Sequence, residues 1–440
     1  MNRGAAGFSR YQGLTFLIGL GFFTMGLMDP LYDTFVPQFL EDFLDSKGLI
    51  GLIMTLDNGF ALFMIPLVAH LSDNTRTRIG RRMPYILVTL PLSGILFAAI
   101  PFATAAGLIA LIVVLFFLNI FKQAARGPVV ALMPDTIPGE YRSEANGVIN
   151  TMGAIAAILG TVALGPLVGI SVNLPIIGDS ERKIPFLIAG ILVVVVTIVL
   201  FLLVKEKQRA SDAEEKREPL VRSLKLIAGA QDRSALWVLV SIFFWFLAYQ
   251  GLLPFLGLYT KEIIGTSESL TSLSAGAVGV AYGVFAIPSG FLAHKIGRKK
   301  VIRYGLAIAA GLLVLVYLHA QIVIPSGAPF AIVLGSFWLL LFLFGTVWGG
   351  VITNSFPMLW QMATFSNMGI YTGLYYFFSQ GAAIVSPPIA GAIIDFAGYP
   401  ATFVYAGVCM LIAFTTMGRV TSGEAGDPAL QDTPDNEWDS

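Results

Sequence analysis

The chain has 440 residues, of which 56% are hydrophobic and only 12% are charged, and its formal net charge is zero. Soluble domains carry about a quarter charged residues, so this composition is typical of a membrane protein. The balanced charge excludes nucleic acid as a partner, because phosphate binding needs an excess of Lys and Arg.

Apolar stretches long enough to cross a bilayer as helices recur twelve times along the chain. The first six are predicted at 13–38, 48–71, 83–104, 107–133, 146–170 and 185–204. The last six are predicted at 234–258, 270–293, 301–320, 328–355, 367–393 and 400–418. The sequence therefore predicts an all-α membrane protein with twelve transmembrane helices.

Polar segments divide this array into domains. The only long polar interior segment is 205–233, and the acidic, apolar-poor tail begins at Thr421. Low hydrophobicity of this kind is typical of disorder. We expect an N-terminal six-helix bundle at 1–204, a cytoplasmic linker at 205–233, a C-terminal six-helix bundle at 234–420 and a disordered tail at 421–440.

The distribution of basic residues predicts the orientation. If both termini are cytoplasmic, 21 of the 27 Lys and Arg residues fall in cytoplasmic segments. The outer loops then hold only four, and two more lie inside a span; these six are Lys47, Arg182, Lys183, Lys261, Lys122 and Arg126. Positive charge accumulates on the cytoplasmic side of membrane proteins. We expect a protein of the plasma or inner membrane with both termini in the cytoplasm.

Two basic loops occupy equivalent places in the two halves. Gly80-Arg81-Arg82 follows the second span, and Gly297-Arg298-Lys299-Lys300 follows the eighth. A recurring basic loop indicates an internal duplication. In this respect the chain resembles the major facilitator architecture, with two six-helix halves each built of 3+3 inverted repeats.

Three motifs carry a closer resemblance. Ser72–Arg82 with Met83-Pro84-Tyr85-Ile86, Arg126–Asp135 and Gly369–Tyr376 with Ser386-Pro387-Pro388 are similar to segments of the sucrose transporter group and its relatives, the glycoside-pentoside-hexuronide cation symporters. This resemblance implies symport of a sugar or glycoside by alternating access. It also implies cation coupling; we favour protons, and Na⁺ stays open.

Two other functions remain open. Gly160 and Gly165-Pro166 in the fifth span resemble a motif of drug/proton antiporters, although their spacing fits it poorly. Small residues that let helices pack closely are the preferred interpretation. A drug or metabolite antiporter of the same fold is one alternative, and a membrane sensor without flux is the other.

Placing a charged side chain inside a membrane span costs free energy, so such residues indicate a functional or structural role. Five of them gather in the first half: Asp29, Asp33, Asp57, Lys122 and Arg126. Asp29, Asp57 and Lys122 reach similar depths, whereas Asp33 lies nearer the outer surface, where solvation is an equal alternative. Carboxylates beside cations in a helical bundle predict a proton-coupling site. For Lys122 three orientations are open: it faces a cavity, pairs with Asp57 or extends toward the membrane surface.

The second half is rich in aromatic and amide side chains instead. Aromatic faces bind the C–H surfaces of sugars, and amides bind their hydroxyl groups. The candidate substrate-binding residues are Tyr249, Gln250, Trp348, Tyr375, Tyr376 and Gln380, with Asn119 from the first half.

Opposite charges at the cytoplasmic ends of spans predict a gate. Ion pairs there can hold the inner side shut and break as the two halves move. The candidate gate residues are Asp73, Arg76, Arg81, Arg82, Asp135, Arg142, Gly297 and Arg298.

The sequence contains no motif that is typical of an enzyme. The three histidines His70, His294 and His319 lack metal-ligand spacing, and no glycine-rich phosphate loop follows a strand. The single cysteine, Cys409, excludes a disulfide within one chain. We expect no enzyme activity, no cofactor and no metal, and a monomer whose partners are a small-molecule substrate, a coupling cation and the lipid bilayer.

Overall fold

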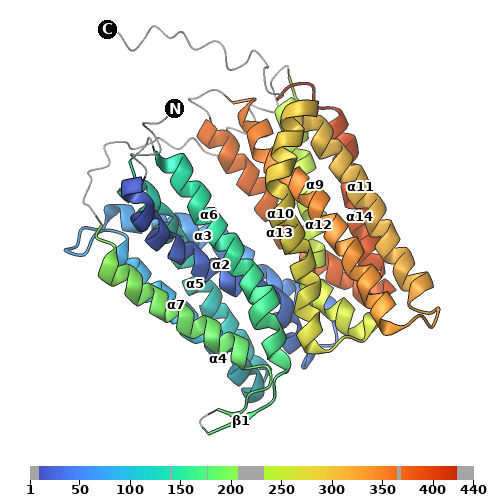
Figure 1. Ribbon diagram of the computed structural model, residues 1–440, viewed down its shortest axis with the longest axis horizontal. Coiled ribbons are helices and arrows are strands. Elements are labelled where there is room, and N and C mark those ends of the chain that lie inside the picture. The colour runs from blue at the N-terminus through green and yellow to red at the C-terminus, as the bar shows by residue number, and fades with distance from the viewer. Residues whose placement is uncertain (1–8, 139–140, 176, 207–231, 364–367, 424–440) are drawn as a thin grey trace. The chain divides into compact units, whose positions relative to one another are not determined.

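A computed structural model describes residues 9–138, 141–175, 177–206, 232–363 and 368–423. Within these ranges the chain is nearly all helical, and twelve helices are long and apolar enough to cross a membrane (Figure 1). The prediction of an all-α protein with twelve spans is confirmed. The predicted linker and tail fall largely outside the described residues.

The helices follow one another along the chain in two sets of six spans. The first six spans are formed by η1 (Ser9–Tyr11) with α2 (Gln12–Glu41), α3 (Lys47–Asn74), α4 (Met83–Ala106), α5 (Leu108–Thr136), α6 (Arg142–Ile158) with η3 (Leu159–Leu164) and η4 (Gly165–Gly169), and α7 (Ile184–Leu203). The last six are formed by α9 (Ser234–Tyr259) with η5 (Thr260–Ile264), α10 (Glu268–Ile296), α11 (Arg298–Leu318) with η6 (His319–Val323), α12 (Phe330–Trp360), α13 (Met368–Ala397) and α14 (Ala401–Gly418).

Strands are confined to one short hairpin in the described part of the chain. β1 (Asn173–Leu174) pairs antiparallel with β2 (Gly178–Asp179), so that Asn173 faces Asp179. The hairpin connects η4 to α7.

The chain forms two compact units. Among the described residues, unit 1 comprises those of Met1–Asp212 together with Leu256–Gly276, and unit 2 comprises those of Ala213–Phe255 and Ala277–Ser440. In unit 1, α2 packs against α6 and α7, α4 packs against α5 and α7, and α3 packs against α5 (Figure 1). In unit 2, α11 packs against α12 and α14.

Several spans are longer than predicted, for local reasons. The seventh was expected to end at 258, but a π-helical turn carries it to Ile264, where Gly265 adopts a positive φ of 78° and ends it. The tenth was expected to end at 355 and continues to Trp360. Asn354 and Ser355 do not end it, because their side chains donate hydrogen bonds to carbonyl groups of their own helix.

Close helix packing positions α2 in unit 1. A side chain at Gly26 would collide with the backbone carbonyl of Gly153 on α6, so this crossing requires glycine. Pro30 follows within α2 and removes one backbone hydrogen bond in the middle of the span.

Candidate functional site

Polar residues follow one face of α5 and one face of α2 in unit 1. Their spacing of three and four residues places them on the same side of each helix. They are Asn119, Lys122, Gln123 and Arg126 on α5, and Asp29, Tyr32 and Asp33 on α2.

Lys122 joins two of the carboxylates predicted for the proton site. Its Nζ lies 2.9 Å from Oδ1 of Asp29 and 2.9 Å from Oδ1 of Asp57 on α3. The Lys122 side chain is only 4% exposed, and the Tyr32 ring centroid lies 4.7 Å from its ammonium group. Burying an ammonium group is costly, and two carboxylates and an aromatic face offset that cost. Of the three orientations left open for Lys122, the structure has the paired one.

Two amides complete this polar layer. Gln123 donates to Oδ1 of Asp57 at 2.5 Å, and Asn119 donates to the hydroxyl of Tyr32 at 2.8 Å. The Asn119 Oδ1 and the Gln123 Oε1 are buried without a hydrogen-bond partner among the described residues. Sequence reasoning missed Tyr32 and Gln123, although each lies three or four residues from a charged residue of the same face.

Asp33 and Arg126 lie on the same faces but are not joined to Lys122. Among the described residues, neither forms an ion pair or a hydrogen bond, and the Arg126 side chain is exposed. We call the five charged residues Asp29, Asp33, Asp57, Lys122 and Arg126 the ion cluster. It contains three carboxylates and two cations, so with every group ionised its net charge is −1.

Aromatic side chains of unit 2 gather round Trp348 on α12. Tyr249 of α9 stacks on its ring with centroids 4.5 Å apart, and Phe344 lies parallel to it at 6.3 Å. Phe246 meets the Trp348 ring edge-on at 5.9 Å. Tyr375 of α13 is buried, and its hydroxyl shares a 3.0 Å hydrogen bond with Ser355. The structure thus brings three of the predicted substrate residues, Tyr249, Trp348 and Tyr375, into one aromatic cluster.

The other predicted substrate residues differ in exposure. Tyr376 is 53% exposed, Gln250 and Gln380 are half-buried, and Asn119 is fully buried against Tyr32 in unit 1. The Gln380 Oε1 is buried and lacks a hydrogen-bond partner among the described residues. Such an amide oxygen can accept a hydrogen bond from a ligand hydroxyl.

The loop between α3 and α4 brings both of its last arginines to one carboxylate. Arg81 donates to Asp135, near the end of α5, from Nε at 3.1 Å and Nη2 at 2.6 Å, and Arg82 Nε donates to it at 2.9 Å. Arg82 also pairs with Asp73 and donates to the Ser72 hydroxyl at 2.5 Å. Hydrogen bonds to Asp135 raise the pKa of Arg81 above its ordinary value.

Glu206 is a member of this group that sequence reasoning missed. Its carboxylate accepts the backbone N–H groups of Arg82 at 2.9 Å and Met83 at 3.2 Å, where α4 begins. Helix N-termini favour negative charge, so this contact stabilises Glu206 as an anion. Sequence reasoning assigned it to the polar linker at 205–233. The signal that could have identified it is its position as an acidic residue just after the end of a span. We call Asp73, Arg81, Arg82, Asp135 and Glu206 the arginine network.

The remaining gate candidates lie elsewhere. Arg76 is exposed, and the side chain of Arg142, expected beside Asp135, lies outside the described side chains. In unit 2, Gly297 precedes α11 with a positive φ of 95°, and Arg298 Nη1 donates to the carbonyl of Pro357 at 3.3 Å. Among the described side chains of unit 1, Arg76 forms no ion pair with Asp135.

A second ionic group lies at the opposite end of the unit 1 helices. Arg182, with a φ of 61°, donates to Asp42 at 2.5 Å and pairs with Glu268. Burial opposes the charge of Arg182, but the bonds to Glu268 and Asp42 raise its pKa above the ordinary value. This group was not predicted, because its members are far apart in sequence.

Comparison with known families identifies the architecture. The model of the Major Facilitator Superfamily matches residues 18–272 and 247–433. The chain belongs to this superfamily. Proteins of the superfamily are carriers without enzyme activity, so this chain is a membrane transporter and not an enzyme.

Two relatives within the superfamily match in sequence. A class H tetracycline resistance protein of Pasteurella multocida is 23% identical over 317 residues, which cover 69% of this chain and 72% of the relative. The inner membrane transport protein YajR of Escherichia coli (strain K12) is 39% identical over 80 residues, 18% of each chain.

Solved structures of superfamily transporters share the fold. A bacterial homologue of the human lysosomal transporter Spinster, in an inward-facing unoccupied state, has 14% identity and a TM-score of 0.71, covering 93% of this chain and 98% of its own. A mutant of the nucleoside transporter NupG has 13% identity and a TM-score of 0.71 over 93% and 100%. A D-xylose–proton symporter has 16% identity and a TM-score of 0.66 over 93% and 98%. At these identities the likeness is one of fold, so the resemblance to the sucrose transporter group stays a prediction.

Proposed function

We propose that this superfamily member is a proton-coupled symporter of a small, uncharged polar solute, such as a sugar or glycoside, that works by alternating access. The observation that carries the proposal is the charge imbalance of the ion cluster. Lys122 pairs with two carboxylates at 2.9 Å each, Arg126 is the second cation of the cluster, and Asp33 forms no ion pair among the described residues. An uncompensated charge inside a membrane span is expensive, and binding one proton removes it.

Asp33 is the proton-binding group in this proposal. Proton uptake makes the ion cluster neutral, and release returns it to a net charge of −1. The charged groups that face Asp33 from α2, α3 and α5 are Asp29, Asp57 and Lys122, and Arg126 acts on Asp29. The sequences of α4 and α7 carry no charged residue, and Arg142 and Glu144 lie in the first turn of α6.

The polar and aromatic groups suit an uncharged hydroxylated substrate. Gln380 has a buried amide oxygen without a partner among the described residues, and Tyr249 presents a half-buried ring beside Trp348. Proteins use both amide oxygens and aromatic rings to bind sugars. The D-xylose–proton symporter of the same fold supports this substrate class by analogy.

The test uses the purified chain in proteoliposomes. Thermal-shift screening against mono-, di- and glycoside sugars first selects a ligand, and its uptake is then followed with an imposed inward proton gradient. Uphill accumulation should require the gradient and be lost in Asp33→Asn. The exposed Asp45→Asn is the matched control and should behave like the unmodified chain. Accumulation by Asp33→Asn equal to that control would remove Asp33 from the coupling site.

A drug/proton antiporter is the second candidate, favoured by the tetracycline resistance relative. In this case an acidic lumen, rather than an acidic exterior, should drive accumulation in the same proteoliposomes. Lipophilic cations should then compete for transport. A sensor without flux would bind its ligand and show neither response.

The orientation and gate follow from the same proposal. We infer that both termini and the arginine network face the cytoplasm, since 21 of the 27 basic residues would lie on that side. The arginine network then holds the cytoplasmic ends of α3, α4 and α5 together in one state of the cycle. The division into halves of 3+3 inverted repeats and the monomeric state belong to the same hypothesis.

A further inference from the structure

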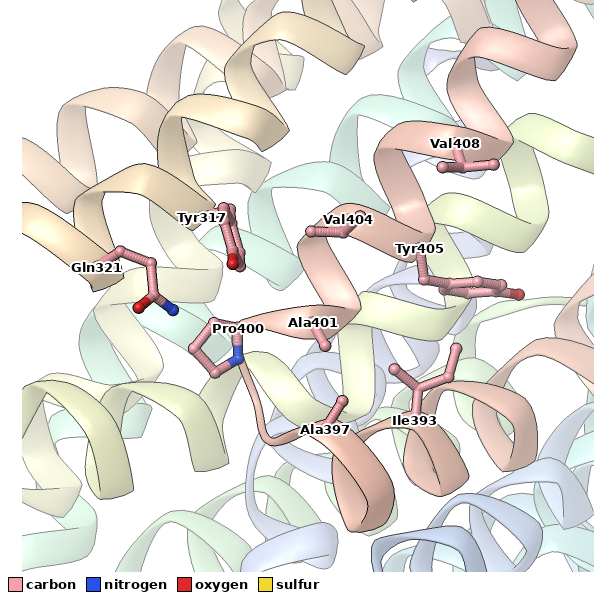
Figure 2. Close-up of a pocket in the computed structure, with 9 residues that line it drawn as sticks. All are labelled: Tyr317, Gln321, Ile393, Ala397, Pro400, Ala401, Val404, Tyr405 and Val408. Atoms are coloured by element: carbon pink, nitrogen blue, oxygen red, sulfur yellow. The ribbon is translucent and has the colours of Figure 1, made fainter.

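An open groove lies on unit 2, where α14 begins beside the ends of α11 and α13. Its volume is about 490 Å³, within the range of roughly 300–1,000 Å³ that small-molecule sites occupy. Tyr317 and Gln321 border it from α11 and η6, opposite Pro400 and Val404 (Figure 2). None of the nine side chains that line it is charged.

The groove runs from the end of the spans toward their middle. Pro400 immediately precedes α14, Ala397 is the last residue of α13, and Gln321 lies in the final turn of its span. Val408 lies eight residues beyond Pro400, which is about 12 Å along a helix. One end of the groove therefore lies at the membrane interface, and the other lies within the hydrocarbon region.

Its walls have the polarity gradient of a phospholipid. Val404 and Val408 are exposed, and on a membrane-spanning helix an exposed apolar face contacts lipid chains. At the interfacial end, Tyr317 and Gln321 carry a hydroxyl and an amide that form no hydrogen bond among the described residues. Apolar contact alone retains no particular lipid, since bilayer chains are as apolar as valine. Retention therefore depends on these two hydrogen-bonding groups.

We propose that the groove binds one phospholipid, with an acyl chain along Val404 and Val408 and an ester carbonyl accepting hydrogen bonds from Tyr317 and Gln321. Ester carbonyls are acceptors only, and both protein groups can donate. Without a charged lining residue, the site reads the ester region and is indifferent to headgroup charge. This inference is independent of the transported substrate.

The experiment is native mass spectrometry of the full chain released from nanodiscs that contain equal amounts of phosphatidylethanolamine and phosphatidylglycerol. We expect one retained lipid, from either headgroup class. Val404→Trp fills the groove and should abolish retention, whereas Leu411→Trp, on an exposed position of the same helix outside the lining, should not. Gln321→Leu should lower retention about fivefold, the effect of losing one neutral hydrogen bond. Ether-linked analogues of the same lipids, which lack the ester carbonyl, should also be retained more weakly than the ester lipids.

Four outcomes would overturn the proposal. Equal lipid retention by Val404→Trp and Leu411→Trp would show that the groove holds no lipid. Strong preference for one headgroup charge, or equal retention of ester and ether lipids, would contradict ester recognition. A dimer mass that disappears in Val404→Trp would identify a second copy of the chain as the occupant.

Discussion

The ion cluster and the arginine network contain the same charges, three carboxylates and two cations, but balance them differently. In the arginine network the third carboxylate is Glu206, which accepts backbone N–H groups at the start of α4. In the ion cluster it is Asp33, which has neither an ion pair nor a hydrogen bond among the described residues. One excess carboxylate is bound at a helix N-terminus, and the other has no partner among the described residues, which is why we propose it as the proton-binding group.

The two central cations differ in the same way. Lys122 carries a compact charge that touches the carboxylates of Asp29 and Asp57. Arg82 has a planar guanidinium group that, besides its carboxylate partners, also binds Ser72 and the carbonyl of Ala69. A planar guanidinium fixes the geometry of its partners, and an ammonium group does not. The difference supports the proposal that the network holds one arrangement and that the cluster changes its protonation.

The largest expected effect is that of Lys122→Met. Removing the cation leaves two partly exposed carboxylates facing each other. Breaking a fully buried ion pair costs about 3–5 kcal/mol, and the 35% exposure of the Asp29 side chain lowers that cost here. Thermal unfolding in detergent should show the loss, more strongly at alkaline than at acidic pH, because protons relieve the repulsion. Lys122→Arg, which keeps the charge, is the control. An unchanged unfolding temperature in Lys122→Met would mean that the pairs contribute nothing to stability.

The next effect is on coupling rather than on stability. Asp29→Asn and Asp57→Asn each remove one charge that Lys122 balances, so the ion cluster is neutral without a bound proton. We expect both variants to lose uphill accumulation in proteoliposomes while keeping some exchange of substrate across the membrane. Accumulation at the level of the unmodified chain in both variants would contradict the assignment of the cluster to coupling.

Sequence reasoning was effective where polarity alone carries the signal. Twelve spans and the presence of charged residues in them follow from hydropathy, and Asp29, Asp57 and Lys122 were grouped by depth alone. Tyr32 and Gln123 were missed because the free-energy cost of an uncharged tyrosine or glutamine in a membrane span is too small to mark it as functional. Glu206 and the Arg182–Glu268 pair were missed because their contacts join residues 86 to 124 positions apart in the chain.

A smaller effect is expected at Asp135 in the arginine network. Asp135→Asn removes the charge but keeps an acceptor oxygen for the two arginines, and a neutral hydrogen bond is weaker than a charged one by about 1 kcal/mol. Glu206 remains to balance part of the charge, so we expect a folded protein that favours the state with this end open. Cysteine labelling of the cytoplasmic half of the cavity should speed up, and labelling of the outer half should slow. Slower labelling on the cytoplasmic side would reverse the assigned role.

The smallest effect is expected for Asp73→Asn. This variant separates the exposed contact of Arg82 with Asp73 from the buried contacts of the arginines with Asp135. Asp73 is nearly half exposed, and Arg82 is its one binding partner in the described part of the chain. Arg82 itself keeps Asp135, Ser72 and Ala69 as partners. A pair of this kind contributes about 0–1 kcal/mol. A conformational equilibrium near balance still shifts several-fold with that free energy, so labelling should change in the same direction as in Asp135→Asn but by less. The measurement is clean, because Cys409 is the only native thiol to replace. If Asp73→Asn changes labelling as much as Asp135→Asn does, the exposed contact is the main latch and the buried bonds only shape the loop.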